Sequence, residues 1–479
     1  PTATLPKRVA SFFITQLGTA MLINHYCYFK ILLLGLLLGS VRITPCHSSA
    51  FNLKNIAGDS HRCVDCAIVG GGPGGLATAI ALSSSSPSSS IAIFEKDRFE
   101  PKGSTVSISP SGWKSIAGLD HGDGSLTTKL KETGVTVSAF ENRPWLEEKD
   151  TDIQRTGKLG RLRTFVEERL CALKRKVTEL FFTGRVHMWH DVRVALFEYA
   201  KERYLASRNV TSTDVDENSV GVDLLVNLGL TLEKIKSLSP SEEEDGARFE
   251  LSFKSISSVE EIKIRARFLI ACDGVQSPVR SILPNEPDVL LSEERSLWRG
   301  TAPNVLCSPG LATYFLGSRD SNSAGRSGLI FPSGKNAGSS WTVISDHAEA
   351  QRSDSNDESK RRVLRVIESM GKDSHNFKRF KEVIDDSPVI IENKLYVRDF
   401  DKPWEASYDG LIYVGDSAHP IRPTGEGIAL ALEDAYVLAK VVSEVGLSVK
   451  AFREYESERY ESVKAISEKA RKFAESRYD

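Results

Sequence analysis

The chain has 479 residues, of which 40% are hydrophobic and 26% are charged, and its formal net charge at pH 7 is −2. This length and composition suit one large globular unit or two tightly packed ones, and they exclude a disordered or fibrous protein. The charge gives no reason to expect a nucleic-acid partner, and the seven scattered cysteines are too sparse for a disulfide framework.

Residues 1–50 have the features of a targeting leader. They contain basic residues but no acidic one, and the apolar run Ile31–Gly39 is shorter than the ~20 residues that a spanning helix needs. The small residues Ser48–Ala50 form a cleavage-site pattern, and the junction with Phe51 resembles that of algal plastid leaders. We expect a cleavable leader for a plastid or the secretory route. The alternative is an uncleaved membrane anchor, which would then make the only membrane contact.

The first folded elements form a βαβ unit. Residues 64–69 read as a buried strand, Leu76–Leu82 opens a helix, and Ile91–Phe94 reads as a second strand. Cys63 and Cys66 form a CxxC motif, which we interpret as two ordinary cysteines beside a buried strand, with a zinc or redox role as the weaker alternative.

The turn between the first strand and the helix carries Gly-x-Gly-x-x-Gly. Gly70 permits a tight turn, Gly72 lets the backbone approach a pyrophosphate, and Gly75 lets the helix lie near the strand, with Gly74 beside it. Glu95 ends the second strand twenty residues after Gly75, where a carboxylate accepts the ribose hydroxyls of an adenosine. This pattern predicts a bound dinucleotide, and the acid favours FAD or NAD over NADP.

The rest of the chain alternates between helical and strand-rich stretches. Residues 125–205 read as mainly helical, with strands near Val135 and Val186. Residues 219–272 and 288–345 read as strands, and residues 347–386 as charged helices. We predict a leader (1–50), a first part of a nucleotide-binding domain (51–150), a mixed segment (151–287), a substrate domain (288–400), and a second nucleotide-binding part with C-terminal helices (401–479).

Two further motifs follow predicted strands. The strand Phe268–Cys272 ends in Asp273-Gly274, and the strand 411–415 ends in Gly415-Asp416. Pro423, Gly425 and Gly427 then precede a helix predicted over Gly427–Val445. With the glycine turn, and over residues 64–445, these motifs resemble the fingerprints of the single-component FAD-dependent monooxygenases, the p-hydroxybenzoate hydroxylase-like aromatic hydroxylases.

The resemblance implies an α/β fold: a Rossmann-like FAD-binding domain with an inserted strand-rich substrate domain and C-terminal helices. It implies that Asp273 and Gly274 lie at the pyrophosphate, that Gly415 and Asp416 bind the ribityl chain, and that Pro423 lies beside the site of oxygen reaction. Gly425 and Gly427 would bring backbone N–H groups to the flavin ring, at the positive end of a helix.

The activity implied is hydroxylation or epoxidation of a small aromatic or isoprenoid-type molecule by oxygen through a flavin hydroperoxide, with NADPH or NADH as a transient reductant. The single Gly-x-Gly-x-x-Gly agrees with a reductant that has no domain of its own. We assign no catalytic acid or base, and we expect no metal at His187 and His190. Two alternatives stay open: a reductase or cyclase of the same fold, similar to geranylgeranyl reductases, and a non-enzymatic binding protein.

Some residues depart from the family pattern. Glu426 stands where the family often has Gln, and we expect its carboxylate to point away from the flavin or to bind a cation. Trp189 stands where the family often has an FAD-contacting arginine, and Arg193 cannot be assumed to replace it. We expect His419 to pack or form a hydrogen bond rather than act as a base. The aromatic residues Tyr314, Phe331 and Trp341 either line a substrate cavity or pack in the core.

Overall fold

The computed structural model describes residues 63–101, 103–120, 122–146, 184–207, 226–239, 241–242, 246–256, 261–308, 310–317, 325–336, 338–345 and 355–478. The predicted leader lies outside these ranges, so its cleavage and destination stay predictions. Within the described ranges, no helix combines the length and the apolar character needed to cross a membrane.

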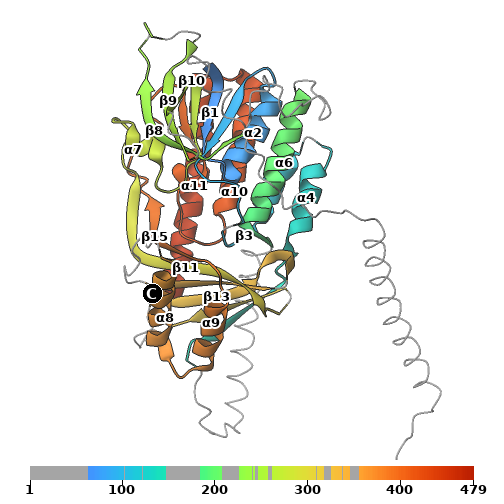
Figure 1. Cartoon of the computed structure of the whole chain (residues 1–479), viewed down its shortest axis with the longest axis vertical. Helices are drawn as coiled ribbons and strands as arrows, with labels where there is room; N and C mark the ends of the chain where they lie inside the picture. The colour runs from blue at the N-terminus through green and yellow to red at the C-terminus, as the bar shows by residue number, and fades with distance from the viewer. Residues whose placement is uncertain are drawn as a thin grey trace, which may run out of the picture. The chain divides into compact units, whose positions relative to one another are not determined.

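One half of the fold is built on a seven-stranded sheet of order β7-β2-β1-β10-β9-β8, with β16 paired to β10 (Figure 1). Its strands are β1 (Cys63–Val69), β2 (Ile91–Glu95), β7 (Val226–Leu228), β8 (Leu230–Ser237), β9 (Phe249–Ser255), β10 (Glu261–Ala271) and β16 (Leu411–Tyr413). Strands β2, β1, β10 and β16 run parallel, and β9 is antiparallel to both of its neighbours. The parallel strands are apolar runs buried on both faces, as a covered parallel sheet requires.

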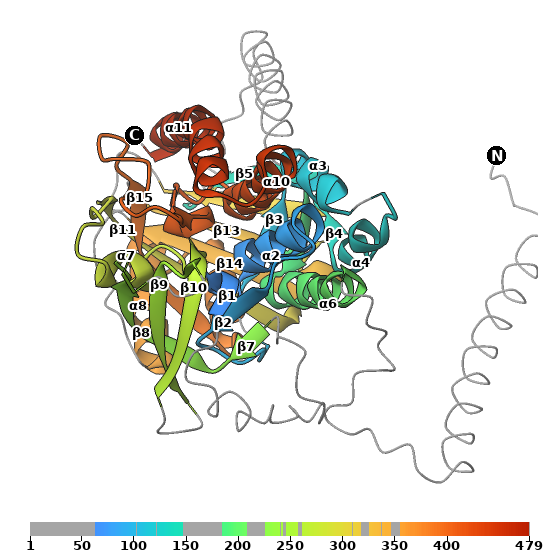
Figure 2. The same ribbon diagram turned by 90° about the horizontal axis from the view of Figure 1, so that it is seen from above.

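Helices from both ends of the chain cover this sheet. They are α2 (Pro73–Ser85), α3 (Pro110–Leu119), α4 (Ser125–Thr133), α6 (Trp189–Ser207), α10 (Gly427–Val445) and α11 (Val449–Tyr478). Figure 2 shows α2 lying between α10 and α6 beside β1. Helix α2 is apolar on nearly all sides because both helices and the sheet surround it.

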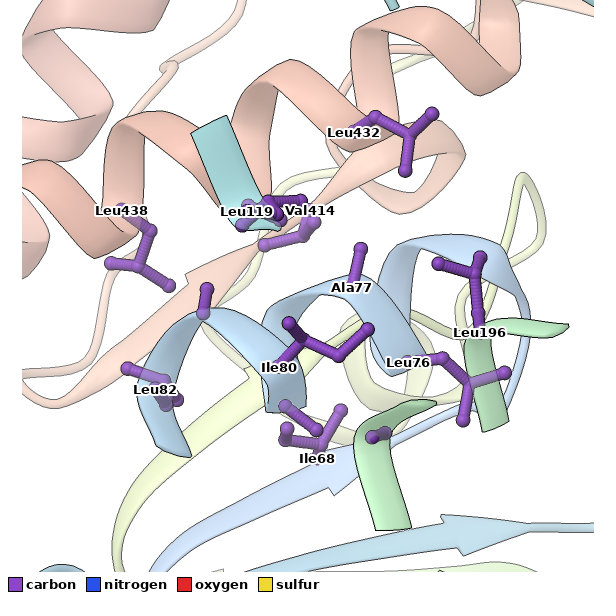
Figure 3. Close-up of a cluster of buried hydrophobic side chains, with 14 of the residues drawn as sticks. Ile68, Leu76, Ala77, Ile80, Leu82, Leu119, Leu196, Val414, Leu432 and Leu438 are labelled. Carbon is purple, nitrogen blue, oxygen red and sulfur yellow. The ribbon is translucent and has the colours of Figure 1, made fainter. Parts of the chain in front are cut away.

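The main hydrophobic core joins segments far apart in sequence. In Figure 3, Ile68 of β1 and Ile80 of α2 lie below Leu432 and Leu438 of α10, with Leu196 of α6 at the side. All five side chains are fully buried. The early βαβ unit and the late helix therefore share one hydrophobic core.

The other half of the fold is a six-stranded sheet of order β15-β11-β14-β13-β12-β5. Its strands are β5 (Ala139–Pro144), β11 (Leu290–Leu306), β12 (Leu311–Leu316), β13 (Ser327–Pro332), β14 (Gly338–Ser345) and β15 (Ile390–Arg398). Helices α8 (Asn356–Gly371) and α9 (His375–Asp385) cover one face (Figure 1). Strand β5 comes from the segment 51–150, so the chain passes between the two halves more often than the predicted division implies.

Short elements complete the fold. A three-stranded sheet contains β3 (Thr105–Ile108), β6 (Arg185–Met188) and β4 (Val135–Thr136). The remaining elements are α7 (Pro278–Ile282) and the 3-10 turns η3 (Gly334–Asn336) and η4 (Gly415–Ser417). Cys66 is fully buried in β1 and Cys63 begins the strand, which agrees with the interpretation of the CxxC as ordinary cysteines. The predicted α/β fold, with its inserted strand-rich domain and C-terminal helices, is confirmed.

Candidate functional site

The register of the parallel strands brings the sequence motifs to one edge of the sheet. Val69 of β1 pairs with Phe94 of β2 on one side and with Ala271 of β10 on the other. Ala271 in turn pairs with Tyr413 of β16. The glycine turn, Glu95, Asp273 and Asp416 all follow these paired residues, so they meet at the carboxyl ends of the strands, where α/β sheets bind ligands.

The glycine turn is shaped by close backbone contacts on one side and open space on the other. Gly70 has a φ of +106°, and a Cβ there would lie 2.3 Å from the carbonyl oxygen of Cys272. A Cβ at Gly75 would lie 2.0 Å from the carbonyl oxygen of Gly70, while a Cβ at Gly74 would only touch Ala431 at 3.4 Å. A Cβ at Gly72 would meet no protein atom within 4 Å among the described residues. Gly70 and Gly75 are therefore required by the fold, whereas Gly72 faces the cavity described below.

Glu95 is fixed at the end of β2 by backbone donors. Its Oε2 accepts a 2.7 Å hydrogen bond from the N–H of Gly71, and its Oε1 accepts a 2.8 Å bond from the N–H of Asp97. Arg193 of α6 lies 3.3 Å from Oε2 and donates from Nε to the carbonyl oxygen of Gly71. A carboxylate has about four acceptor positions, so Glu95 keeps acceptor capacity for a ligand.

Asp273 lies beside the glycine turn with one oxygen bonded and one free. Its Oδ2 accepts 2.9 Å hydrogen bonds from the Ser277 hydroxyl and the Val279 N–H. Its Oδ1 is buried and has no hydrogen-bond partner among the described residues. Protein surrounds the carboxyl group except toward the cavity, and this burial raises the pKa of Asp273 to about 6 against the lowering effect of those hydrogen bonds. Gly274 follows with a φ of +88°.

Asp416 projects from η4 at the end of β16. Its side chain is open to the cavity, but the surrounding protein desolvates the carboxylate and raises its pKa, while His419 and Arg299 act in the opposite direction. The backbone before Asp416 is fixed by a hydrogen bond, which Gly415 donates from its N–H to Asp434, and Gly415 has a φ of +66°. His419 donates a 2.6 Å hydrogen bond from Nε2 to the Asp434 carboxylate and is 1% exposed, which agrees with the expected hydrogen-bonding role.

The segment before α10 brings backbone groups to the same space. Pro423, Gly425 and Gly427 line the cavity, and Gly425 has a φ of +92° that favours glycine. The first amides of α10 add partial positive charge there. Glu426 is not among the residues that line the cavity, and burial raises its pKa while Ser109 and Lys469 act in the opposite direction.

A single cavity of about 1320 Å³ connects these motifs to the uncovered face of the second sheet. It is larger than the ~300–1,000 Å³ typical of a site for one small ligand, so it has room for a cofactor and a second molecule. Side chains that alternate along the strands line its far wall: Leu297, Arg299, Ala312, Tyr314, Leu329, Phe331, Thr342 and Ile344.

The aromatic residues divide between the two faces of this sheet. Tyr314 and Phe331 line the cavity. Trp341 is fully buried on the opposite face, where it packs with the α8 and α9 residues and donates to the Ser387 hydroxyl at 2.7 Å. The interpretation of Trp341 as a cavity residue is therefore wrong, and its core interpretation holds.

Cavity-lining polar atoms without partners indicate what the cavity holds. Buried atoms of Arg193, Asp273, Arg299 and Thr424 have no hydrogen-bond partner among the described residues. Leaving such groups unpaired is unfavourable, so they fit a polar ligand that supplies both donors and acceptors. The glycine turn, the acid after β2 and the helix end match a dinucleotide. Fold and cavity together define a dinucleotide-binding protein in which the nucleotide-binding motifs and a strand-rich domain share one cavity.

Comparison with known sequences identifies the family. Residues 226–470 match the sequence profile described as the FAD binding domain, which is more than half of the chain, and the protein belongs to this family. The predicted resemblance to single-component FAD-dependent monooxygenases is thereby confirmed. No curated protein matches the sequence.

Solved structures share the fold at low sequence identity. CtdE in complex with FAD and substrate 4 superimposes with a TM-score of 0.61 at 17% identity, covering 87% of this chain and 90% of that one. Klebsiella pneumoniae HpxO complexed with FAD and uric acid gives a TM-score of 0.58 at 18% identity, with coverages of 86% and 89%. The tetracycline destructase Tet(51) gives 0.55 at 15% identity, with coverages of 86% and 89%.

Sequence reasoning did not assign several residues that the structure brings to the cavity. Arg299 lies on the cavity face of β11 with Leu297, two residues before it, and this alternation is the signal that could have indicated it. Arg193 lies one helical turn after Trp189, and both line the cavity.

His187 is buried and bonded to the Thr133 hydroxyl at 2.9 Å, and desolvation lowers its pKa to about 4.

Proposed function

We propose that the protein is an FAD-dependent monooxygenase that uses NAD(P)H and oxygen to hydroxylate or epoxidise a small aromatic or isoprenoid-type molecule. The observation that carries this proposal is the single cavity, which has nucleotide-binding motifs on one wall and the apolar face of the substrate sheet on the other. A cofactor and a substrate bound in one cavity can react directly with each other.

Bound FAD would accept hydride from NAD(P)H and would activate oxygen. The chain's own residues would position it. The turn at Gly70–Gly75 would hold the pyrophosphate with backbone N–H groups, Glu95 would accept ribose hydroxyls, and Asp416 would accept ribityl hydroxyls. The N-terminal amides of α10, next to Gly425 and Gly427, would stabilise negative charge on the flavin ring.

The opposite wall supports an organic substrate with a large apolar part. Tyr314, Leu329 and Phe331 present apolar surface from neighbouring strands, and Phe140 packs against Tyr314 with ring centroids 6.3 Å apart. Such a wall excludes water from the reacting atoms. Arg299 adds a positive charge, and burial lowers its pKa while Asp416 favours its charged form. A guanidinium stays protonated, so it can hold a developing or resident negative charge on the substrate.

The test is a coupled assay of the purified protein supplied with FAD. We expect NADPH or NADH oxidation and oxygen uptake to increase with a phenol or an isoprenoid, and we expect isotopically labelled oxygen to appear in the product. Reductant oxidation that yields a reduced or cyclised product without label would favour the reductase or cyclase alternative. A protein that binds a candidate ligand but neither FAD nor reductant would favour the non-enzymatic alternative.

A further inference from the structure

Arg193 links the two parts of the site that are expected to hold the adenosine end of FAD. Its Nε donates a 2.8 Å hydrogen bond to the carbonyl oxygen of Gly71, inside the glycine turn. Its Nη2 lies 3.3 Å from Oε2 of Glu95. Its guanidinium carbon lies 4.0 Å from the centre of the Phe99 ring, which supports the flat face of the group.

This arginine is incompletely satisfied although it is 1% exposed. The contact of Nη2 with Glu95 lacks hydrogen-bond geometry, and neither Nη1 nor Nη2 has a hydrogen-bond partner among the described residues. A guanidinium carries five N–H donors, and only the one on Nε is used here. Buried charged donors without acceptors are strongly unfavourable, so the arrangement requires an acceptor from elsewhere.

The cavity is where that acceptor can lie. Arg193 lines it together with Gly70, Gly72 and Glu95. The planar fork of an arginine matches phosphate oxygens in a bidentate geometry, and its N–H groups can also donate to hydroxyl oxygens. The ligand expected beside the glycine turn carries both of these groups in its pyrophosphate and its adenosine ribose.

The charge of Arg193 lies one helical turn after Trp189 on α6. The resemblance places an FAD-contacting arginine at Trp189, which cannot supply a charge. Arg193 follows it by four residues, so the two side chains lie on the same face of the helix, one turn apart. The Trp189 ring packs on Gly103, where a Cβ would lie 3.1 Å from it, and the Arg193 guanidinium lies 5.2 Å from the ring centre.

We propose that Arg193 is an FAD-binding residue of this chain that contacts the adenosine ribose and pyrophosphate half of the cofactor, and that it takes over the charge lost at Trp189. The inference rests on the proposed function only in that FAD must occupy the cavity. It goes beyond the family pattern because the charge is displaced by one helical turn.

The experiment measures dissociation constants of the apoprotein for FAD and for ADP, which lacks the flavin. Variants are R193M, which keeps most of the side-chain volume, R193K, which keeps the charge without the fork, and R193M combined with W189R. The matched control is R203M on the same helix, since Arg203 is partly exposed and pairs with Asp123 at 3.6 Å. The melting temperature of each apoprotein is measured without ligand.

We expect R193M to weaken FAD and ADP binding by roughly 10- to 100-fold, since it removes charge-assisted hydrogen bonds. R193K is expected to lie between R193M and the wild type, and W189R is expected to recover at least about tenfold in the R193M background. R203M should bind both ligands as the wild type does.

Several results would overturn the inference. FAD affinity of R193M within about twofold of the wild type would remove Arg193 from the site. Weakened FAD binding with unchanged ADP binding would contradict the assignment to the adenosine half. Loss of FAD binding in proportion to a lowered apoprotein melting temperature, without rescue by W189R, would make Arg193 a structural residue. If R193M does not fold, R193K carries the same test. A wild-type protein that binds no FAD would instead refute the proposed function.

Discussion

The backbone N–H of Gly415 donates a 2.7 Å hydrogen bond to Oδ2 of Asp434, which lies in the middle of α10. The same carboxylate bonds His419 at 2.6 Å through Oδ2 and Arg459 at 2.6 Å through Oδ1. These partners lower the pKa of Asp434 to about 2 despite its complete burial. Asp434 therefore fixes the turn from which Asp416 projects into the cavity, and it does so without lining the cavity itself.

Replacing Asp434 with Asn should destabilise the apoprotein by up to about 3–5 kcal/mol, because it removes the 2.6 Å charged partner of the buried Arg459 and leaves only Glu433 at 3.3 Å. The native pKa is below the unfolded value of 3.8, so this contribution is present above about pH 4 and is lost as the pH falls toward 2. Chemical denaturation of both proteins between pH 7 and 3 measures it. The control is E458Q, since Glu458 is an exposed partner of Lys440. A variant as stable as the wild type would refute the role of Asp434.

Gly72 and Gly75 should respond differently to a side chain. Gly72 has φ −75° and ψ 179°, which other residues adopt readily, and its Cβ direction is open. We expect G72V to change the apoprotein's free energy of unfolding by no more than about 1 kcal/mol and to abolish FAD retention. G75A should instead destabilise the apoprotein by about 1–3 kcal/mol through its contact with Gly70. Denaturation and FAD titration measure both. Full FAD retention by G72V would contradict the assignment of the turn.

Asp273 should make FAD binding dependent on pH. Burial raises its pKa to about 6, so the carboxyl group is protonated below that pH and negatively charged above it. A negative charge beside a pyrophosphate is unfavourable. The affinity for FAD is therefore expected to fall as the pH rises through about 6, and D273N should remove this dependence while it retains affinity at higher pH. Titrations between pH 5 and 8 test this. A wild-type affinity that is independent of pH would contradict it.

The raised pKa of Asp273 also affects the stability of the apoprotein. Its effect changes with pH in the opposite direction to that of the lowered pKa of Asp434. Because the native pKa of Asp273 is raised above the unfolded value of 3.8, the native state binds the extra proton, and the stability contribution is lost as the pH rises from about 4 to about 6. D273N is expected to gain stability relative to the wild type at neutral pH. Denaturation at pH 4 and pH 7 separates this effect from cofactor binding.

Asp416 should matter to the cofactor more than to the fold. Its ionised form is unfavourable in the protein, so D416A is not expected to lower the stability of the apoprotein. The variant should weaken FAD binding by roughly 10- to 100-fold through the loss of hydrogen bonds to a charged acceptor. The control is D409A, since Asp409 is exposed and lies 3.3 Å from Arg453. FAD affinity equal to that of the wild type would remove Asp416 from the site.

The elements that sequence analysis predicted best are those specified locally. The strand 64–69, the glycine turn and the helix Gly427–Val445 appear in the structure with nearly the predicted bounds. Apolar runs, glycines and helix-end residues within a few positions of each other determine them. The meeting of the motifs was predictable as well, because strands that are parallel place their carboxyl ends at one edge of the sheet.

The features that were not predicted depend on contacts between distant segments. Helices α8 and α9 cover one face of the substrate sheet and the other face lines the cavity, and both faces carry apolar side chains. Trp341 and Phe331 are therefore alike in sequence, and only the packing of α8 and α9 shows which of them faces the cavity. Strand β5 pairs with β12 in parallel, although more than 160 residues separate them. Its few residues carry no local signal for that partner.

The central claim is tested most directly by the visible absorption spectrum of purified residues 51–479 after incubation with FAD, recorded before and after anaerobic addition of NADPH or NADH and again after oxygen is admitted. We predict a yellow protein that loses its colour with the reductant and regains it as oxygen is consumed, faster when a phenol or isoprenoid substrate is present. A protein that stays colourless and takes up no FAD would contradict the account, and a yellow protein whose reduced form does not react with oxygen would contradict the monooxygenase assignment.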